Sequence, residues 1–394
     1  MEIEKELNEI LKILNMHGKG YIVGGYVRDK LLGVKPKDCD FCTDIDYEKL
    51  LHIFKKYNPK EIGKTFGIVQ INYKGKAYEI AKLRRDSDFT KERNKLQIEF
   101  VNDIYEDLKR RDFTVNAIAF NGEKLIYESE LSKEDIKNKV IRFVGEGRER
   151  IKEDPLRLLR GIRIATEKSM EIDKETEKFM FLERDSLKNI SMERVQEEIF
   201  KIFKSENIYF GMKKLVELKT LQGIFPKLQR DIEKNQNLEK ISNISGSIKL
   251  SLIFLFSKEN LEELKKLKIE KRLKIEIENS IKTYDEVEKL DTKYSIRKFL
   301  NIYGANVLKN ILEVKRLRKV ESIFNEIIEN SDPIELKDLK VNGKDLMDIG
   351  ISSGPKIKEL LLLLMEIILK EPNINRKELL IEKAKEMLWK KEYL

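Results

Sequence analysis

Two aspartates separated by a single residue, Asp38 and Asp40, are the first feature of the sequence that could do chemistry. On a strand, alternate side chains lie on the same face, so both carboxylates would point the same way. Two such oxygen ligands can hold Mg²⁺, an ion that usually also binds substrate phosphates. A solvated strand end could carry the same pair, so the spacing alone leaves both interpretations open.

A glycine pair, Gly24-Gly25, precedes these aspartates and follows the apolar run 21–23. Glycine lets the backbone bend and approach a ligand closely. A helix that starts at this turn would direct its free N–H groups at the ligand, which suits a triphosphate. The order of strand, glycine turn, helix, basic loop and D-x-D strand indicates a site for a nucleoside triphosphate and Mg²⁺.

A third carboxylate, Glu79, stands in the segment KAYEIAKL between Tyr78 and Ile80. On a strand beside the two aspartates it would complete a two-metal site and help to activate an attacking hydroxyl. An acid between apolar residues also fits the solvent face of an ordinary strand.

The segment KEDPLRLLRGIRIA, residues 152–165, predicts a helix start with Asp154 as the N-cap and Pro155 at the first helical position. Glu153, Arg157 and Arg160 then recur on one face of the helix. An amphipathic helix supported by glutamate–arginine pairs would show the same spacing.

The elements that must position these residues fall into two classes. Up to about residue 125 the chain mixes helices with short apolar runs, whereas from about residue 130 apolar residues recur at helical spacing with few Gly or Pro residues. The sequence therefore predicts an α/β head with a small mixed sheet, followed by an all-α remainder. The expected strands are 21–23, 39–42, 68–73, 77–83 and 97–101.

Composition narrows the function classes. The net charge of +9 favours an anionic partner such as nucleic acid. An AT-biased genome, which raises the number of lysines, would also raise the net charge. Cys39 and Cys42 are the only cysteines and there are two histidines, so these residues cannot assemble a four-ligand zinc site. We interpret both cysteines as reduced thiols of a cytoplasmic protein. The N-terminus does not resemble a signal peptide, and the longest apolar run, 360–365, is too short to span a bilayer, so we expect no membrane role.

The combination of GGYVRDKLLG with DCD resembles the signature of the class II tRNA nucleotidyltransferase and bacterial poly(A) polymerase family. The resemblance extends from about residue 20 to residue 370. Its further motifs lie at 107–120, 133–145, 152–165, 191–202 and 340–357.

The resemblance implies roles for individual residues. The implied catalytic residues are Asp38, Asp40 and Glu79, and the two aspartates bind the metal ions. The pair Arg111 and Asp112 contacts the ribose, and the pair Asp154 and Arg157, with Arg160 in support, reads the base. The implied nucleotide-binding residues are Gly24, Gly25, Arg28, Arg111, Asp112, Asp154, Arg157 and Arg160.

The resemblance also implies an organisation and an activity. We expect a catalytic head at 1–137, a base-recognising neck at 138–200, a body at 201–290 and a tRNA-binding tail at 291–394, whose contact residues the sequence does not identify. The expected reaction is Mg²⁺-dependent addition of C, C and A from CTP and ATP to the tRNA 3′ end, with release of pyrophosphate. No obligate protein partner is evident. An A-adding enzyme or a poly(A) polymerase is the alternative, and a non-catalytic RNA-binding relative is a distant one.

One linker segment departs from the family pattern, and one helix start in the tail stays open between two interpretations. In the linker after Glu79, many family members carry an Arg-basic-Pro run, whereas this chain has Arg93-Asn94-Lys95, although the full linker length matches members that add A. In the tail, Gly354-Pro355 predicts either a phosphate-facing helix start or a plain turn.

Overall fold

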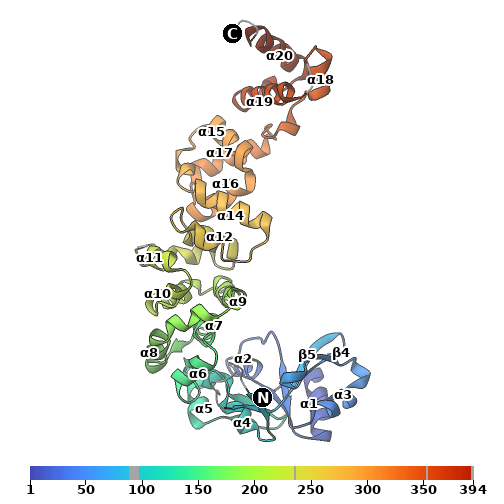
Figure 1. The fold of residues 1–394 in the computed structure, drawn as a ribbon, viewed down its shortest axis with the longest axis vertical. Helices are drawn as coiled ribbons and strands as arrows, with labels where there is room; N and C mark the ends of the chain where they lie inside the picture. Colours follow the sequence, from blue (N-terminus) through green and yellow to red (C-terminus); the bar gives the residue numbers. More distant parts are fainter. Residues whose placement is uncertain (88–96, 235–236, 352–353, 392–394) are drawn as a thin grey trace. The chain divides into compact units, whose positions relative to one another are not determined.

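The computed structural model describes residues 1–87, 97–234, 237–351 and 354–391 (Figure 1). The run at 93–95 therefore lies outside the described residues. The chain divides into two compact units, Met1–Ser245 and Gly246–Leu394. The finer division into head, neck, body and tail stays a prediction.

A seven-stranded sheet organises the first part of unit Met1–Ser245, with the strand order β3-β4-β5-β2-β1-β8-β9. β2 and β5 pair in parallel, and the other neighbours in the sheet pair antiparallel. The strands are β1 Gly20–Val23, β2 Asp40–Thr43, β3 Lys60–Gly63, β4 Ile68–Tyr73, β5 Lys76–Lys82, β8 Ile118–Phe120 and β9 Leu125–Tyr127.

Apolar side chains at the centre of this sheet form the core of the head. Ile22, Phe41 and Ile80 come from three adjacent strands and are almost completely buried. Helix α1 (Lys5–His17) contacts β1 and buries a stripe that includes Ile10 and Leu14. Helix α2 (Gly25–Leu31) follows β1. Helix α3 (Tyr47–Ile53) contacts β4, the strand next to β5 (Figure 1).

The predicted strands are confirmed to within one or two residues. The match is best for β4, and β7 (Gln97–Phe100) pairs with β6 (Arg84–Ser87) in a separate hairpin. The segment FTVNAIAF was not assigned to a strand, yet it forms a short 3₁₀ turn at Thr114–Asn116 and then β8. Its strand was missed because three residues are too few for an alternating pattern to show.

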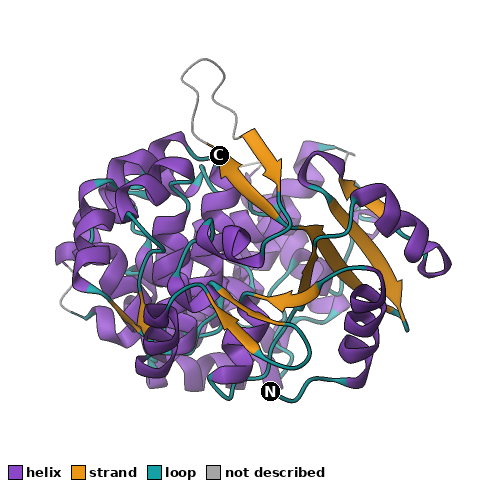
Figure 2. Cartoon of the chain, turned by 90° about the horizontal axis from the view of Figure 1, so that it is seen from below, coloured by secondary structure: helices purple, strands orange, loops and turns teal. Residues whose placement is uncertain are grey.

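Helices dominate after residue 130, as predicted, and Figure 2 separates them by colour from the strands. A two-stranded parallel pair, β10 (Val140–Ile141) and β11 (Glu171–Ile172), is the exception in this part of the first unit. The helices of this part are α5 Glu130–Asn138, α6 Gly147–Glu153, α7 Arg157–Lys168, α8 Lys174–Leu182, α9 Met192–Phe203, α10 Ile208–Glu217 and α11 Pro226–Lys234, and α4 Ile104–Lys109 lies before them.

The predicted N-cap of α7 is confirmed only in part: Oδ1 of Asp154 accepts from the N–H of Leu156 at 3.2 Å, but Asp154 does not directly precede the regular helix. The helix begins at Arg157 after Leu156, and Asp154 instead ends α6. The N–H groups of Arg157 and Leu158 bond to carbonyls three residues back, at 3.0 and 3.1 Å. This tight turn delays the regular helix by two residues, because its hydrogen bonds have the 3₁₀ spacing.

Unit Gly246–Leu394 consists of helices in its described residues. One buried cluster gathers Ile296, Leu308 and Ile327, and a second gathers Leu346 and Ile368. The helices are α12 Ile248–Leu255, α13 Leu261–Leu264, α14 Lys271–Thr283, α15 Lys293–Tyr303, α16 Ala305–Lys315, α17 Arg318–Glu329, α18 Gly343–Asp348, α19 Pro355–Lys370 and α20 Lys377–Lys391. The predicted helix start at Gly354-Pro355 is present. Among the described residues, no helix has both the length and the apolar character needed to cross a membrane.

Candidate active site

The structure brings the three carboxylates singled out in the sequence to one cavity. Asp40 opens β2 and lies opposite Glu79 of the parallel strand β5. Asp38 was expected on the same strand, but it lies in the loop two residues before Asp40, where β2 has not yet begun. All three line a cavity of about 750 Å³.

The electrostatics of this group fit a cation. Burial raises the pKa of Asp40, and the charge of Asp38 raises it further, although Arg111 opposes both effects. Burial also raises the pKa of Glu79, as do the charges of Asp40 and Asp38. A cation would relieve this repulsion, and carboxylate oxygens are ligands that hard divalent cations prefer. Over the described ranges, however, no three acidic, histidine or cysteine side chains converge as a metal site, so the fit rests on Asp38 and Asp40 as a pair.

The glycine turn lies beside the carboxylates because Val23, the last residue of β1, pairs with Asp40. Gly24 has a φ of 68°, and a Cβ there would stand 2.9 Å from Nη1 of Arg111. The Arg111 guanidinium therefore covers the turn, and only glycine leaves room for it. Nη2 of Arg111 donates to Asp107 at 2.9 Å.

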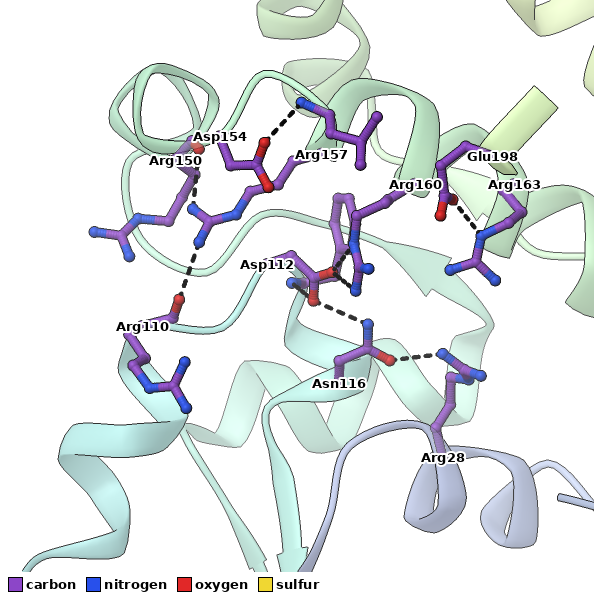
Figure 3. Close-up of polar contacts among 12 residues, drawn as sticks. Arg28, Arg110, Asp112, Asn116, Arg150, Asp154, Arg157, Arg160, Arg163 and Glu198 are labelled. Atoms are coloured by element: carbon purple, nitrogen blue, oxygen red, sulfur yellow. Dashed lines mark hydrogen bonds and ion pairs between the residues drawn. The ribbon is translucent and has the colours of Figure 1, made fainter. Parts of the chain in front are cut away.

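A chain of polar contacts links the glycine-turn helix α2 to α7 (Figure 3). Nη2 of Arg160 lies 2.7 Å from Oδ2 of Asp112, whose Oδ1 accepts from Asn116 at 2.9 Å. The amide oxygen of Asn116 accepts from Arg28 at 2.6 Å, and Arg28 also pairs with Asp29 at 2.7 Å. Burial opposes the charge on Asp112, but its partners, with Arg160 foremost, lower its pKa below the ordinary value.

Asn116 is a site residue that the sequence analysis missed. It is buried and its side-chain amide is used in both directions, accepting from Arg28 and donating to Asp112. A polar amide inside the apolar run FTVNAIAF was the available signal, because a buried amide needs hydrogen-bond partners.

Arg111 and Asp112, expected to act as one ribose-contacting pair, have different partners. Arg111 binds Asp107 on α4, and Asp112 binds Arg160 on α7. The side chains of Arg111 and Asp112 point in different directions because they are neighbours in the chain just after α4 has ended. The Asp112 carboxylate nevertheless has an arginine beside it, since Arg160 forms an ion pair with it.

Asp154 and Arg157, the expected base-reading pair, come from the turn before α7 and from its first residue. Oδ2 of Asp154 accepts from Arg194 of α9 at 2.8 Å. Nη1 of Arg157 donates to Glu153 at 2.5 Å and to the carbonyl of Arg150 at 2.9 Å, as shown for Arg150 in Figure 3. The predicted glutamate–arginine support is thus present. Arg194, which was not singled out in the sequence, is a further residue of this site.

Both cysteines are free thiols, as expected. Cys42 is buried in β2, and Cys39 is partly buried just before that strand. Burial raises the pKa of both thiols, so neither is an activated nucleophile.

Three family descriptions match successive parts of the chain. Residues 20–142 match the poly A polymerase head domain, and residues 169–232 match the probable RNA and SrmB-binding site of polymerase A. Residues 245–384 match the putative tRNA nucleotidyltransferase domain 2. Two of these three matches lie within the first compact unit, and the third covers most of the second.

Among known proteins, the CCA-adding enzyme of Staphylococcus aureus strain MRSA252 is 30% identical over 374 residues, which cover 91% of each chain. A crystal structure of the Bacillus stearothermophilus CCA-adding enzyme in complex with CTP has a TM-score of 0.80 at 25% identity, covering 99% of this chain and 98% of the other. A Thermotoga maritima CCA-adding enzyme complexed with tRNA shares the fold, with a TM-score of 0.71 at 21% identity over 98% and 96% of the chains. By these matches the chain belongs to the class II CCA-adding enzymes of the tRNA nucleotidyltransferase family.

Proposed function

We propose that this nucleotidyltransferase adds C, C and A from CTP and ATP to the 3′ end of tRNA without a nucleic-acid template. The observation that carries the proposal is the convergence of Asp38, Asp40 and Glu79 on one cavity beside the Gly24 turn. The tRNA 3′-hydroxyl oxygen forms a bond to the α-phosphorus. The bond between that phosphorus and the oxygen that bridges it to the β-phosphate breaks, and pyrophosphate leaves.

Nucleotidyltransferases of this family generally use a divalent metal, and we propose that it is Mg²⁺ here. Asp38 and Asp40 would hold it, and when bound it would neutralise charge that develops on the phosphate oxygens. Glu79 helps to activate the attacking hydroxyl. Its raised pKa supports this role, since a base works better when its pKa is nearer the working pH.

The basic groups at the glycine turn suit the triphosphate. Arg111 lies over Gly24, and Arg28 is fixed in α2 by Asn116 and Asp29. Charge-assisted hydrogen bonds from guanidinium groups are among the stronger contacts that a phosphate can receive. We propose that Asp112, whose Oδ2 is held by Arg160 at 2.7 Å, accepts a hydrogen bond from the ribose hydroxyl.

Base choice rests on Asp154 and Arg157. Cytosine and adenine both present an amino donor beside a ring-nitrogen acceptor, which a carboxylate and a guanidinium can match. Uracil and guanine present a carbonyl beside a ring N–H, so the same pair would leave polar groups unpaired. For Asp154 and Arg157 to read a base, they must exchange contacts with their present partners, Arg194 and Glu153.

We further propose that unit Gly246–Leu394 contributes tRNA binding and that the four-part division 1–137, 138–200, 201–290 and 291–394 describes the functional organisation. The match of residues 245–384 to a tRNA nucleotidyltransferase domain supports this assignment. Two free thiols fit a reducing compartment, and we place the protein in the cytoplasm.

The test is incorporation of each radiolabelled nucleotide into tRNA transcripts that end before CC, before A, or with CCA complete. A CCA-adding enzyme adds two C residues and one A to the first transcript, adds A to the second and leaves the third unextended. Addition of A only to the second transcript would identify an A-adding enzyme, and extension of the third would identify a poly(A) polymerase. Failure to extend any transcript would overturn the proposed activity.

A further inference from the structure

The cavity beside the catalytic carboxylates has a second set of charged side chains that the proposed reaction does not use. Lys35 and Lys37 come from the loop before β2, and Lys76 opens β5. All three lysines are exposed and line the same cavity as the carboxylates.

Lys76 opens β5 three residues before Glu79, and Lys37 lies in the loop three residues before Asp40, where β2 has not yet begun. Because Asp40 lies opposite Glu79 in a parallel pair, both lysines come from the same end of the two strands. Side chains three residues apart on a strand point to opposite faces, so the common cavity lining is what brings these lysines beside Asp40 and Glu79.

These lysines differ from their neighbours in lacking an ion-pair partner within the described parts of the chain. Lys30 pairs with Glu4 at 3.0 Å, Lys74 with Glu9 at 2.6 Å, and Lys82 with Asp46 at 2.7 Å. In the ranges that the structure describes, no carboxylate forms an ion pair with Lys35, Lys37 or Lys76. Their charges are thus available to a ligand.

Acidic groups also line this cavity, and an anionic RNA could approach them only if cations offset their repulsion. Glu4 and Glu6 stand on its wall together with the three catalytic carboxylates, although Glu4 is already bound by Lys30 and Tyr26. A phosphate that approaches so many carboxylates is repelled unless cations lie along its path. Lys35, Lys37 and Lys76 are cations in that position.

We propose that Lys35, Lys37 and Lys76 bind the phosphodiester groups of the last nucleotides of the acceptor RNA and so guide its 3′ end to Glu79. This inference rests on the proposed function, because it assigns the route of that reaction's RNA substrate. The nucleotide's triphosphate has its own cations on the opposite side of Asp40. The sheet order β5-β2-β1 puts the Gly24 turn, with Arg111 over it, on the β1 side and Lys76 on the β5 side.

The test compares two triple variants that each remove three positive charges. One is Lys35→Gln/Lys37→Gln/Lys76→Gln. The matched control is Lys64→Gln/Lys74→Gln/Lys133→Gln, which removes exposed lysines that are ion-paired and lie outside the cavity. The dissociation constant for a tRNA transcript ending in CC is measured over a series of KCl concentrations, and KM is measured for the transcript and for ATP.

The cavity variant should bind the transcript with a shallower salt dependence. The slope of log Kd against log salt should fall by about 0.7 for each lost phosphate contact to single-stranded RNA, or roughly 2 in all. The control should lose less than half of that. KM for the transcript should rise in the cavity variant while KM for ATP stays within twofold of wild type.

A second arm locates the contact on the RNA. Methylphosphonate linkages at the three 3′-terminal positions remove the phosphate charges without changing the bases. They should weaken binding to the wild-type protein and have little further effect on the cavity variant, since contacts to the same groups are not additive. This arm includes the unaltered protein, so it remains informative if a variant folds poorly.

Several results would overturn the inference. Equal salt slopes for cavity and control variants would show that these lysines make no special contact. Equal sensitivity of wild type and cavity variant to methylphosphonates would place the contact elsewhere. A change confined to KM for ATP or to inhibition by pyrophosphate would assign the lysines to the polyphosphate. In each case a wild-type protein that adds A to the transcript leaves the proposed function standing, whereas an inactive wild type would count against that function itself.

Discussion

Asp40 lies at the meeting point of three strands, opposite both Val23 and Glu79. Its carboxylate is needed for the metal ion but is not part of the distributed basic surface that binds RNA. Asp40→Asn should therefore reduce nucleotide addition at least about a thousandfold, or roughly 4 kcal/mol of transition-state stabilisation, with tRNA affinity within about twofold of wild type. Single-turnover addition and filter binding measure the two effects. Asp46→Asn, which changes an exposed aspartate, is the control and should stay active. Near-normal turnover of Asp40→Asn in Mg²⁺ would contradict the metal assignment.

Asp154 and Arg157 have partners that also give them a structural role. If they read the base, Asp154→Ala and Arg157→Ala should raise the use of UTP or GTP relative to CTP and ATP, because mismatched bases no longer leave unpaired polar groups that cost about 1–3 kcal/mol each. Competition assays with mixed nucleotides measure this ratio. If both variants merely slowed addition and kept full selectivity for C and A, the residues would only stabilise the start of α7.

The buried carboxylate of Asp112 predicts how stability depends on pH. Burial disfavours its charge, yet its contacts with Arg160 and Asn116 outweigh that cost and lower its pKa below the ordinary value of 3.8. A carboxyl whose pKa is lower in the folded state stabilises the fold above pH 3.8 and loses that contribution as pH falls below it. Asp112→Asn should cost about 2 kcal/mol of unfolding free energy near pH 7.

Urea unfolding between pH 7 and pH 3 tests this prediction. The variant should lose less stability than wild type on acidification, since it has no charge at this position to lose. Some acid sensitivity should remain in both proteins, because the pKa of Asp107 is also lowered, by Arg111 and Arg110 acting against its burial. Parallel pH profiles for the two proteins would show that Asp112 does not contribute in this way.

Helix α7 carries Arg157 and Arg160, and its position depends on one close contact at Gly161. A Cβ at Gly161 would stand 2.5 Å from Cε of Met180 and 2.9 Å from Cζ of Phe113. Met180 is flexible, but Phe113 is almost completely buried and stacks on Phe143 at a centroid distance of 5.1 Å. The ring leaves little space for a methyl group, so the helix can pack here only through glycine.

Gly161→Ala should therefore destabilise the protein by about 1–3 kcal/mol through overpacking, despite the better helix propensity of alanine. Gly343→Ala in α18 is the matched control, since its Cβ would meet only Ile357, at an ordinary 3.4 Å, and its effect should be neutral or stabilising. Thermal unfolding measures both. An increase in Tm for Gly161→Ala would mean that α7 shifts to accept the methyl group, and KM for CTP should then change with it.

At the scale of the whole molecule, the boundary between Ser245 and Gly246 separates the catalytic site from the helical second unit. All the residues that we assign to catalysis and nucleotide binding lie in the first unit. A fragment of residues 1–245 should therefore keep CTP affinity within a fewfold of the full chain and lose most of its tRNA affinity. Isothermal titration with CTP and filter binding with tRNA measure the two affinities. Equal loss of both would show that the second unit serves mainly to fold the first.

Salt should have a strong effect on RNA binding by the full chain, whose net charge is +9. Each phosphate that the protein neutralises releases counterions, so tRNA affinity should fall steeply between 50 and 200 mM salt, by about a thousandfold if roughly six phosphates are contacted. The fragment should show a shallower dependence than the full chain, since it has fewer contacts.

The sequence by itself determined the class of fold and indicated where the chemistry would lie. The D-x-D spacing, the glycine pair and the apolar runs follow local rules of strands and turns, and the helical spacing after residue 130 follows from amphipathic packing. These local rules singled out Asp38, Asp40 and Glu79 as candidates, to which the family resemblance gave roles, and they located the strand that became β4. They were not enough for β8, whose three apolar residues show no period of their own.

Only the tertiary structure decided which distant residues meet. The parallel pairing of Asp40 with Glu79 arises from the order of strands in the sheet, which no local pattern specifies. Asn116 between Arg28 and Asp112, and Arg194 on Asp154, depend on how helices and strands far apart in the chain pack together. Such contacts escape sequence reasoning because each side chain, taken alone, has many possible polar partners, and burial of the surrounding apolar surface selects which one lies within reach.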